Sequence, residues 1–183
     1  MILQALANYY EILIADDESK IARHGYSKTG INFAIELSHD GELLEIHPQT
    51  AGSNPNKARY ITVPEQTRRS GKSPRPYFLC DKSAYVLGIA GKDDEKPDFS
   101  RKCFEAFRDF NKELLSKANC DEAEAVIRFL DSYDPRKFEK NPVLARNRDI
   151  IFKKASPVFV FMVEGNFVHK NDEVRRAWDE YYN

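Results

Sequence analysis

The run PVFVFMV, residues 157–163, is the feature that most constrains the fold of this chain. Every residue in it is apolar, most are β-branched or aromatic, and the run is too short for an ordinary helix. Such a run is typical of a β-strand that is covered on both faces. The 183-residue chain is 42% hydrophobic, which is enough apolar residues to bury such a strand in the core of one globular domain.

Other segments carry the alternating pattern of half-buried strands. INFAIELS, residues 31–38, alternates apolar and polar positions, HDGE predicts a turn, and LLEIH, residues 43–47, returns. These segments predict a β-hairpin. RYITVP, residues 59–64, and AYVLGI, residues 84–89, are predicted to be further strands.

Helical periodicity marks four further segments. Residues 1–13 form an amphipathic pattern, a long apolar stripe runs from Phe99 to Ala118, and another helix is predicted from Asp121 to Tyr133. The chain is expected to finish with a helix that is capped near Asn171. This order predicts an α+β domain, an antiparallel sheet core with flanking helices.

A local concentration of positive charge is the main functional signal. The chain as a whole has a net charge of −1, yet residues 57–76 carry six basic side chains against the single acid Glu65. Lysine and arginine neutralise phosphates and release counterions, and arginine also forks onto guanine edges. The candidate nucleic-acid-binding residues are Asn54, Asn56, Lys57, Arg59, Arg68, Arg69, Lys72, Ser73 and Arg75. A solvated loop that only maintains solubility explains the same charges equally well.

Signals for catalysis are weak by comparison. SGKS, residues 70–73, resembles the end of a nucleotide-binding P-loop, but Gln66 occupies the position of its first glycine, and Pro74 and Pro76 remove backbone donors. The four histidines are predicted to be ordinary surface residues, and none lies in a metal-binding or nucleophile motif. We therefore expect a protein that is not an enzyme and that has no catalytic residues and no cofactor.

Metal sites and disulfides are not predicted either. The acidic clusters at residues 16–18 and 93–95 are typical of solvated turns, and the cysteines Cys80, Cys103 and Cys120 lack zinc-ligand spacing. The cysteines are expected to be small core residues. A second basic run, residues 136–154, is interrupted by acids and is predicted to form ion pairs on helix faces. The opening residues lack a basic leader and are too short to span a bilayer, which predicts a cytoplasmic protein without membrane contact.

Several blocks together resemble a known family. MILQALANYYE, SGKSPRPYFLCDKSAYVLG, CFEAF and EGNFVHKNDEVRRAWDEYY occur in this order from residue 1 to residue 182. They resemble the N-terminal part of the large subunit of the type I-C CRISPR Cascade complex, the Cas8c/Csd1 family. The resemblance implies that residues 1–183 correspond to a single N-terminal domain of a longer subunit, without its C-terminal helical bundle.

The resemblance implies a role in RNA-guided antiviral defence. In that family the large subunit recognises the protospacer-adjacent motif on duplex target DNA, lies beside the 5′ handle of the guide RNA with other Cascade subunits, and helps to recruit a helicase-nuclease. An acidic phage inhibitor that mimics DNA would be a natural ligand for the same basic patch. The alternative is a protein-interaction module whose basic loop docks an acidic neighbour in the complex, and a weaker one is a nucleotide-processing enzyme.

Overall fold

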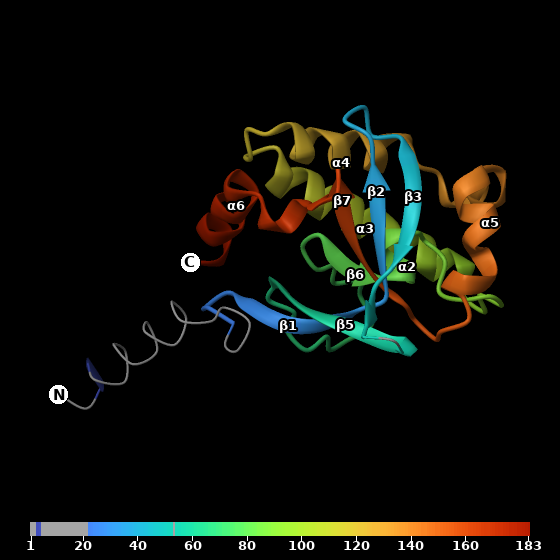
Figure 1. The fold of residues 1–183 in the computed structure, drawn as a ribbon, viewed down its shortest axis with the longest axis horizontal. Coiled ribbons are helices and arrows are strands. Elements are labelled where there is room, and N and C mark those ends of the chain that lie inside the picture. The colour runs from blue at the N-terminus through green and yellow to red at the C-terminus, as the bar shows by residue number, and fades with distance from the viewer. Residues whose placement is uncertain (1–2, 5–21, 53) are drawn as a thin grey trace.

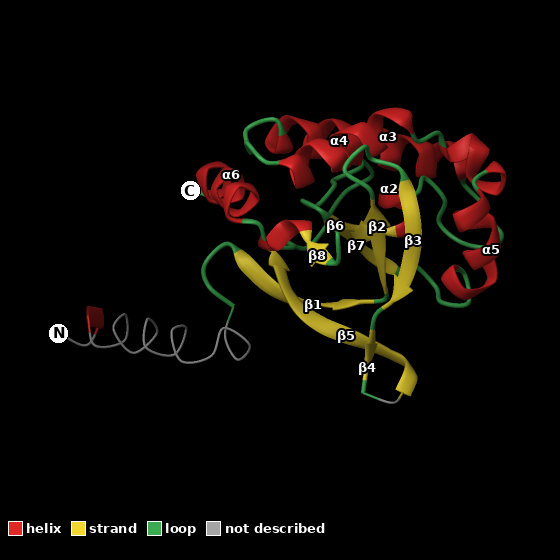
Figure 2. Ribbon diagram, turned by 45° about the horizontal axis from the view of Figure 1, so that its top comes forward, coloured by secondary structure: helices red, strands yellow, loops and turns green. Residues whose placement is uncertain are grey.

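A computed structural model describes residues 3–4, 22–52 and 54–183 of the chain. The helix predicted for residues 1–13 falls almost entirely outside these residues. The described part has three layers, with helices above a mixed sheet and a second, smaller sheet beneath it (Figures 1 and 2). This arrangement confirms the predicted α+β class.

The central layer is a five-stranded sheet in the order β3-β2-β7-β6, with β8 paired to β7. Its strands are β2 (Phe33–Leu37), β3 (Leu43–Pro48), β6 (Cys80–Lys82), β7 (Val158–Val163) and β8 (Asn166–Phe167). The β2–β3 hairpin is the predicted one. Its turn places Gly41 at φ +80° directly on a helix, where an added Cβ would lie 2.7 Å from the Ala125 carbonyl oxygen.

The pairing of β2 with β7 is parallel, so the sheet is mixed where a purely antiparallel one was expected. The chain leaves β2 through the hairpin and reaches β7 only after all the central helices, so the connection is long enough to bring the two strands together in parallel. Hydrophobic periodicity predicts both strands, but it contains no information on their relative direction.

β7 is covered on both faces, as the apolar run predicts. Phe159, Phe161 and Val163 face the main core beneath the helices, whereas Val160 faces a second cluster under the smaller sheet. β2 alternates in the same way, with Phe33 in the main core and Ala34 in the second cluster. The period of two in each strand therefore divides the interior into two apolar layers.

The helical layer consists of α3 (Pro97–Leu115), α4 (Asp121–Ser132), η1 (Pro135–Lys140), α5 (Pro142–Ile151), η2 (Val168–Lys170) and α6 (Asp172–Tyr182). The predicted helices correspond to α3, α4 and α6. The side chain of Asn171 accepts hydrogen bonds from the backbone N–H groups of Glu173 and Val174 and caps α6. Asn141 caps α5 in the same way, and α5 was not predicted.

The second sheet has the order β1-β5-β4, from β1 (Tyr26–Ile31), β4 (Thr50–Ala51) and β5 (Asn54–Pro64). β1 and β5 pair antiparallel, and Ile31, Ile61 and Val63 on their inner face pack into the second cluster. β5 contains the predicted strand at residues 59–64 and extends it towards the N-terminus. Both strands lie at the side of the molecule opposite α3 and α4 (Figure 2).

The strand predicted for residues 84–89 is wrong, because Ser83–Val86 form the short helix α2. The Ser83 N–H donates to the Pro157 carbonyl at 2.9 Å, and the Leu87 N–H donates to the Ser83 carbonyl at 2.8 Å. Tyr85, Val86 and Leu87 are all buried in the main core. Tertiary packing therefore overrides the β propensity of this segment.

His169 is buried at 3% exposure, although all four histidines were predicted to lie at the surface. Its ring packs beside Phe167, with centroids 5.4 Å apart, and lies near the Thr62 backbone. Neither ring nitrogen has a hydrogen-bond partner among the described residues. Burial, together with the nearby charges of Lys170 and Arg175, lowers the pKa of His169 to about 3.

We predict that this histidine makes stability depend on pH. The unfolded histidine binds a proton below pH 6.5 and the folded one only near pH 3, so its contribution is complete above pH 6.5 and is lost as pH falls. Between about pH 7 and pH 5 the loss should be about 2 kcal/mol in the free energy of unfolding, measured with urea. In His169→Leu this part of the loss should disappear, and an identical pH profile for both proteins contradicts the prediction.

Candidate nucleic-acid interface

The basic loop, defined here as residues 66–76, connects β5 to β6 without regular secondary structure. Gly71 adopts φ +95°, a conformation that glycine tolerates best, and its backbone is open to solvent. Irregular backbone at this position is what the glycine and the prolines predict. The side chains of the loop, however, divide into two groups that the sequence does not distinguish.

The first group points inward and is organised by one buried carboxylate. Asp81, in β6, has a fully buried side chain that forms an ion pair with the Arg69 guanidinium. It also accepts hydrogen bonds from the backbone N–H groups of Tyr77, at 2.8 Å, and Lys82, at 2.7 Å. An arginine of the loop therefore neutralises a charge inside the protein.

Two tyrosines enclose the same guanidinium. The Arg69 carbon Cζ lies 3.8 Å from the ring centroid of Tyr77 and 4.0 Å from that of Tyr85. The Arg69 Nε also donates to the Arg75 carbonyl at 2.7 Å, so the side chain bridges back to its own loop. These cation–π contacts and hydrogen bonds fix the guanidinium in one orientation. We call Arg69, Asp81, Tyr77 and Tyr85 the brace.

Further hydrogen bonds hold the loop along its length. The Gln66 side chain donates to the Cys80 carbonyl at 2.8 Å, the Tyr77 hydroxyl donates to the Thr67 carbonyl, and the Arg75 N–H donates to the Tyr85 hydroxyl at 3.2 Å. Each bond joins the loop to the segment that follows it. The backbone of the loop is thus tied down, although it has no helix or strand.

The exit of the loop is fixed to α3 by Asn111, which is fully buried. Its side-chain oxygen accepts from the Leu79 N–H at 2.7 Å, and its amide donates to the Tyr77 carbonyl at 3.2 Å. Phe78 and Leu79 insert into the main core. The loop is therefore anchored to the rigid part of the domain.

The electrostatics of the pair follow from its burial. Burial raises the pKa of the Asp81 carboxyl above its ordinary value, and the hydrogen bonds and charge of Arg69 only partly oppose this. Burial lowers the pKa of the Arg69 guanidinium, but the hydrogen bond and charge of Asp81, together with Tyr85 and Tyr77, outweigh it, so the pKa is raised overall. Burial therefore destabilises the charged form of the Asp81 carboxyl, and the Arg69 guanidinium offsets part of this effect.

The second group of side chains points outward. Lys57 and Arg59 on β5, and Arg68, Lys72, Ser73 and Arg75 on the loop, are exposed. Among the described residues none of these five cations forms an ion pair with a carboxylate. Asn54 and Asn56 belong to the start of β5, where it pairs with β4. Of the predicted contact residues whose side chains the structure describes, only Arg69 is turned into the protein.

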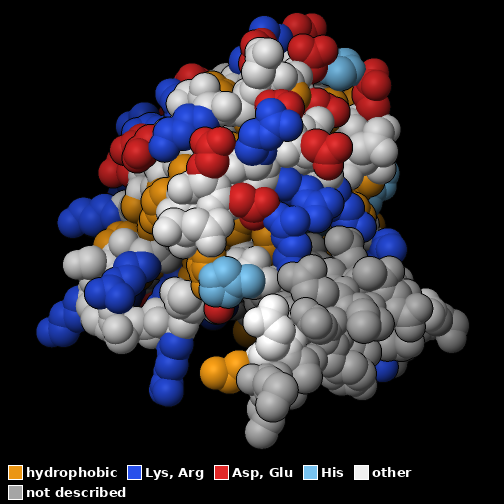
Figure 3. Space-filling view, turned by 90° about the vertical axis from the view of Figure 1, so that its left-hand side faces the viewer, with side chains coloured by type: hydrophobic (Ala, Val, Ile, Leu, Met, Phe, Trp, Pro, Cys, Tyr) orange, Lys and Arg blue, Asp and Glu red, His pale blue; other side chains and the backbone are white. Residues whose placement is uncertain are grey.

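The second basic run behaves differently, as predicted. Arg136 pairs with Asp134 at 3.0 Å, Arg148 pairs with Glu139 at 2.7 Å, and Arg146 pairs with Glu45. In Figure 3, blue and red side chains alternate over the upper, helical part, whereas several blue side chains project from the lower part with little red beside them. Most arginines of the helices are thus neutralised by nearby acids, whereas the exposed cations of β5 and the basic loop have no carboxylate partner among the described residues.

Other site types find little support in the described part of the chain. No group of three or more potential metal ligands occurs among residues 3–4, 22–52 and 54–183, and the cluster at residues 16–18 lies outside them. None of the helices described is long and apolar enough to cross a membrane. All three cysteines are free, with Cys80 and Cys103 buried as expected and Cys120 partly buried.

The brace was missed at the sequence level, although one signal pointed to it. Asp81 is the only acid within the largely apolar stretch from Tyr77 to Ile89, directly after the run of basic residues. A carboxylate in such a stretch needs a buried cationic partner. Arg69 is that partner, and of the two tyrosines beside it only Tyr85 was assigned a place, in a predicted strand.

We predict that Arg69 and its neighbour Arg68 differ in their effect on stability. Arg69→Ala leaves a buried carboxylate without its cation and should lower the free energy of unfolding by about 3 kcal/mol. Arg68→Ala removes an exposed side chain and should change it by less than about 0.5 kcal/mol. Urea denaturation of both variants gives the comparison, and equal effects would argue against the brace.

The comparisons with known proteins identify the family of the chain. The family model described as CRISPR-associated protein (Cas_Csd1) matches residues 6–183, which include the whole basic loop, the brace and α6. A search of curated proteins found no match. Because the family model matches nearly the whole chain, the protein belongs to the Csd1 family of CRISPR-associated proteins.

Proposed function

We propose that the chain is a non-catalytic nucleic-acid-binding subunit of a type I-C CRISPR surveillance complex. In this role it recognises the protospacer-adjacent motif on duplex DNA and contacts the 5′ handle region of the guide RNA. These contacts allow target unwinding and recruitment of the helicase-nuclease. The chain acts as the N-terminal domain of a longer large subunit, and it works in the cytoplasm. Membership of the Csd1 family and the exposed cations of β5 and the basic loop support this proposal.

The observation that carries the proposal is the division of the loop into a fixed backbone and unpaired cations. Arg69 fixes the backbone through Asp81, and Arg68, Lys72 and Arg75 face solvent without carboxylate partners among the described residues. A surface that holds duplex DNA needs cations for phosphates in a defined register. In RNA-guided systems the base pairing reads the long sequence, and the protein reads only a short motif and the backbone.

The roles of the side chains follow from their chemistry. Lys72 supplies a point charge for a phosphate, and Ser73 adds a hydroxyl that can bond to a phosphate oxygen. Arg68 and Arg75 carry planar guanidinium groups that fit either a phosphate or the O6 and N7 atoms of guanine. A loop with a preorganised backbone orders few residues on binding, which favours affinity.

The proposal is tested by removing the exposed charges of the loop together. Arg68→Ala, Lys72→Ala and Arg75→Ala combined should weaken the binding of a motif-containing duplex to the assembled CRISPR complex. The slope of log affinity against log salt should flatten by about one unit for each lost phosphate contact. Fluorescence anisotropy of a labelled duplex over a salt series measures both quantities.

A matched control removes the same charge from the helical layer. Arg101→Ala, Arg128→Ala and Arg136→Ala combined delete three arginines that pair with Asp98, Glu124 and Asp134, respectively. This variant should leave affinity and salt slope nearly unchanged. If the loop variant behaves like this control but fails to assemble with other subunits, the loop is a protein-docking element, and the proposal is wrong. Competition by an acidic phage inhibitor would report on the same surface.

A further inference from the structure

Glu65 lies directly before the basic loop and is the only acid between Lys57 and Pro76. Its carboxylate accepts a hydrogen bond from the Tyr182 hydroxyl on α6, 117 positions away in the sequence. Within the described ranges it forms no ion pair. Coulomb attraction favours an ion pair between a carboxylate and a nearby arginine. The orientation of Glu65 towards a neutral hydroxyl therefore needs a structural cause.

The nearest arginine in the sequence is free to form such a pair. Arg68 follows Glu65 by three residues, is exposed, and has no carboxylate partner in the part of the chain that the structure describes. Three residues of extended chain span at most about 11 Å. The two long side chains can bridge that separation. A Glu65 carboxylate released from α6 would therefore have Arg68 as a partner.

Hydrogen bonds hold the backbone of Glu65 at a junction between α6 and β1. The Glu65 N–H donates to the Gly25 carbonyl at 2.9 Å, and the Trp178 indole N–H donates to the same carbonyl at 2.7 Å. The next N–H, of Gln66, donates to the Ser27 hydroxyl at 3.3 Å. One carbonyl thus joins the entrance of the basic loop to α6.

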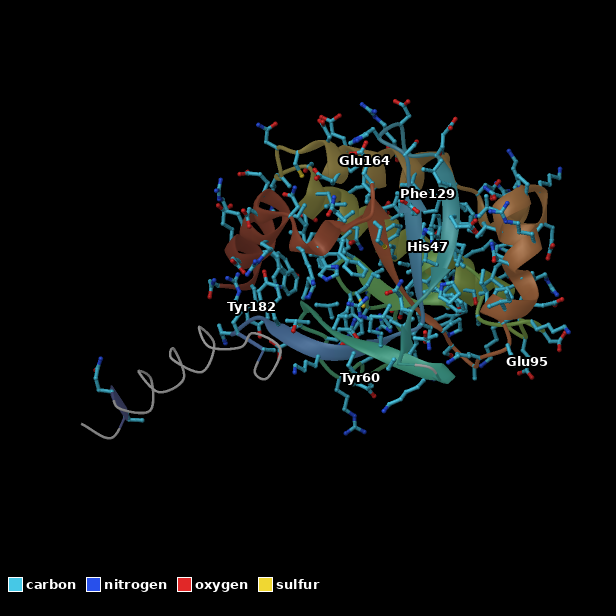
Figure 4. All side chains as sticks on the ribbon, viewed as in Figure 1. His47, Tyr60, Glu95, Phe129, Glu164 and Tyr182 are labelled. Atoms are coloured by element: carbon cyan, nitrogen blue, oxygen red, sulfur yellow. The ribbon has the colours of Figure 1, made fainter. Side chains whose placement is uncertain are left out.

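The ring of Tyr182 is packed at the same junction. Gly25 adopts φ +79°, and a Cβ added to it would lie 3.1 Å from the Cδ1 atom of Tyr182. The ring centroid lies 5.5 Å from that of Trp178 and 5.2 Å from that of His24. Figure 4 shows Tyr182 between the lower end of α6 and the start of β1. The hydroxyl therefore reaches Glu65 from a ring that its neighbours hold in place.

We propose that Tyr182 is a positioning residue for the basic loop, because its hydroxyl holds the Glu65 carboxylate against α6 and prevents it from pairing with Arg68. This inference rests on the proposed function, in which Arg68 contacts the duplex. A cation that an acid has already neutralised releases fewer counterions when it meets a phosphate. Tyr182 thus preserves the positive charge of the loop without touching the nucleic acid.

A hydrogen bond that only stabilises the fold is the alternative explanation. In that case the loss of the Tyr182 hydroxyl lowers the melting temperature, and the DNA affinity of the folded protein does not change. The two explanations differ in the role of the Glu65 charge. Neutralising that charge therefore distinguishes them.

The test measures binding of a labelled, motif-containing duplex to the assembled CRISPR complex over a salt series. Tyr182→Phe keeps the ring and removes only the hydroxyl. It should weaken binding about three- to tenfold and flatten the salt slope by up to about one unit, because the Glu65–Arg68 pair replaces one phosphate contact.

Tyr181→Phe is the matched control on the same helix. Tyr181 is 53% exposed, and its hydroxyl makes no hydrogen bond to any residue that the structure describes. This variant should leave the affinity and the salt slope unchanged. Thermal denaturation of each variant shows whether the fold is retained.

Rescue by a second substitution is the readout that a structural role does not move. Glu65→Gln combined with Tyr182→Phe should bind the duplex within about twofold of the unchanged protein, because a neutral amide does not neutralise Arg68. Glu65→Gln alone should bind equally well. If the hydrogen bond only stabilises the fold, the double variant has no reason to recover any affinity that Tyr182→Phe has lost.

The outcomes also separate this inference from the proposed function. No weakening by Tyr182→Phe, or equal weakening in the single and double variants, overturns the inference. If this result occurs while the combined Arg68, Lys72 and Arg75 variant still weakens binding, the proposed function stands. If that combined variant binds the duplex normally, the loop does not hold DNA, and the inference and the proposed function are both wrong.

Discussion

The surface geometry of this protein depends on one buried ion pair. Asp81 lies at the base of the loop with no solvent to stabilise its charge, and the loop itself provides the compensating cation, Arg69. Because Tyr77 and Tyr85 enclose that guanidinium, the Arg69 side chain is held in one orientation while it neutralises Asp81. The loop is therefore held by one of its own basic residues. The remaining cations of the loop are held outside as a consequence.

The layering of the core explains how the second sheet packs beneath β2 and β7. β2 and β7 bury large aromatic residues towards the helices and smaller ones, Ala34 and Val160, towards the second sheet. The second sheet can then pack closely with Ile31, Ile61 and Val63, which leaves its outer face to solvent. β5 leads into the basic loop, so the exposed cations Lys57 and Arg59 and those of the loop belong to one continuous segment of chain.

Hydrophobic periodicity predicted the helices and strands that the local sequence determines, and it missed the features that depend on tertiary contacts. The hairpin, β7, α3, α4 and α6 follow from apolar spacing and caps. The parallel pairing of β2 and β7 and the helical turn at Ser83 depend on partners distant in sequence. At the site, the turn residues predicted an irregular basic segment, and residues 66–76 do lack helix and strand. The density of charge does not predict that the Arg69 side chain turns inward, because this orientation depends on the burial of Asp81.

The near-zero net charge of the chain conceals a spatial separation of charge. On the helices, acids lie beside arginines, as in the pairs Arg128–Glu124 and Arg136–Asp134, so these charges largely cancel at the surface. β1, β5 and the basic loop contain no acidic residue. Glu65 lies between β5 and the loop, and its carboxylate accepts a hydrogen bond from the Tyr182 hydroxyl. Unpaired cations in one region repel one another and gain free energy when a polyanion approaches. The same separation therefore costs stability in the free domain and provides the driving force for binding nucleic acid.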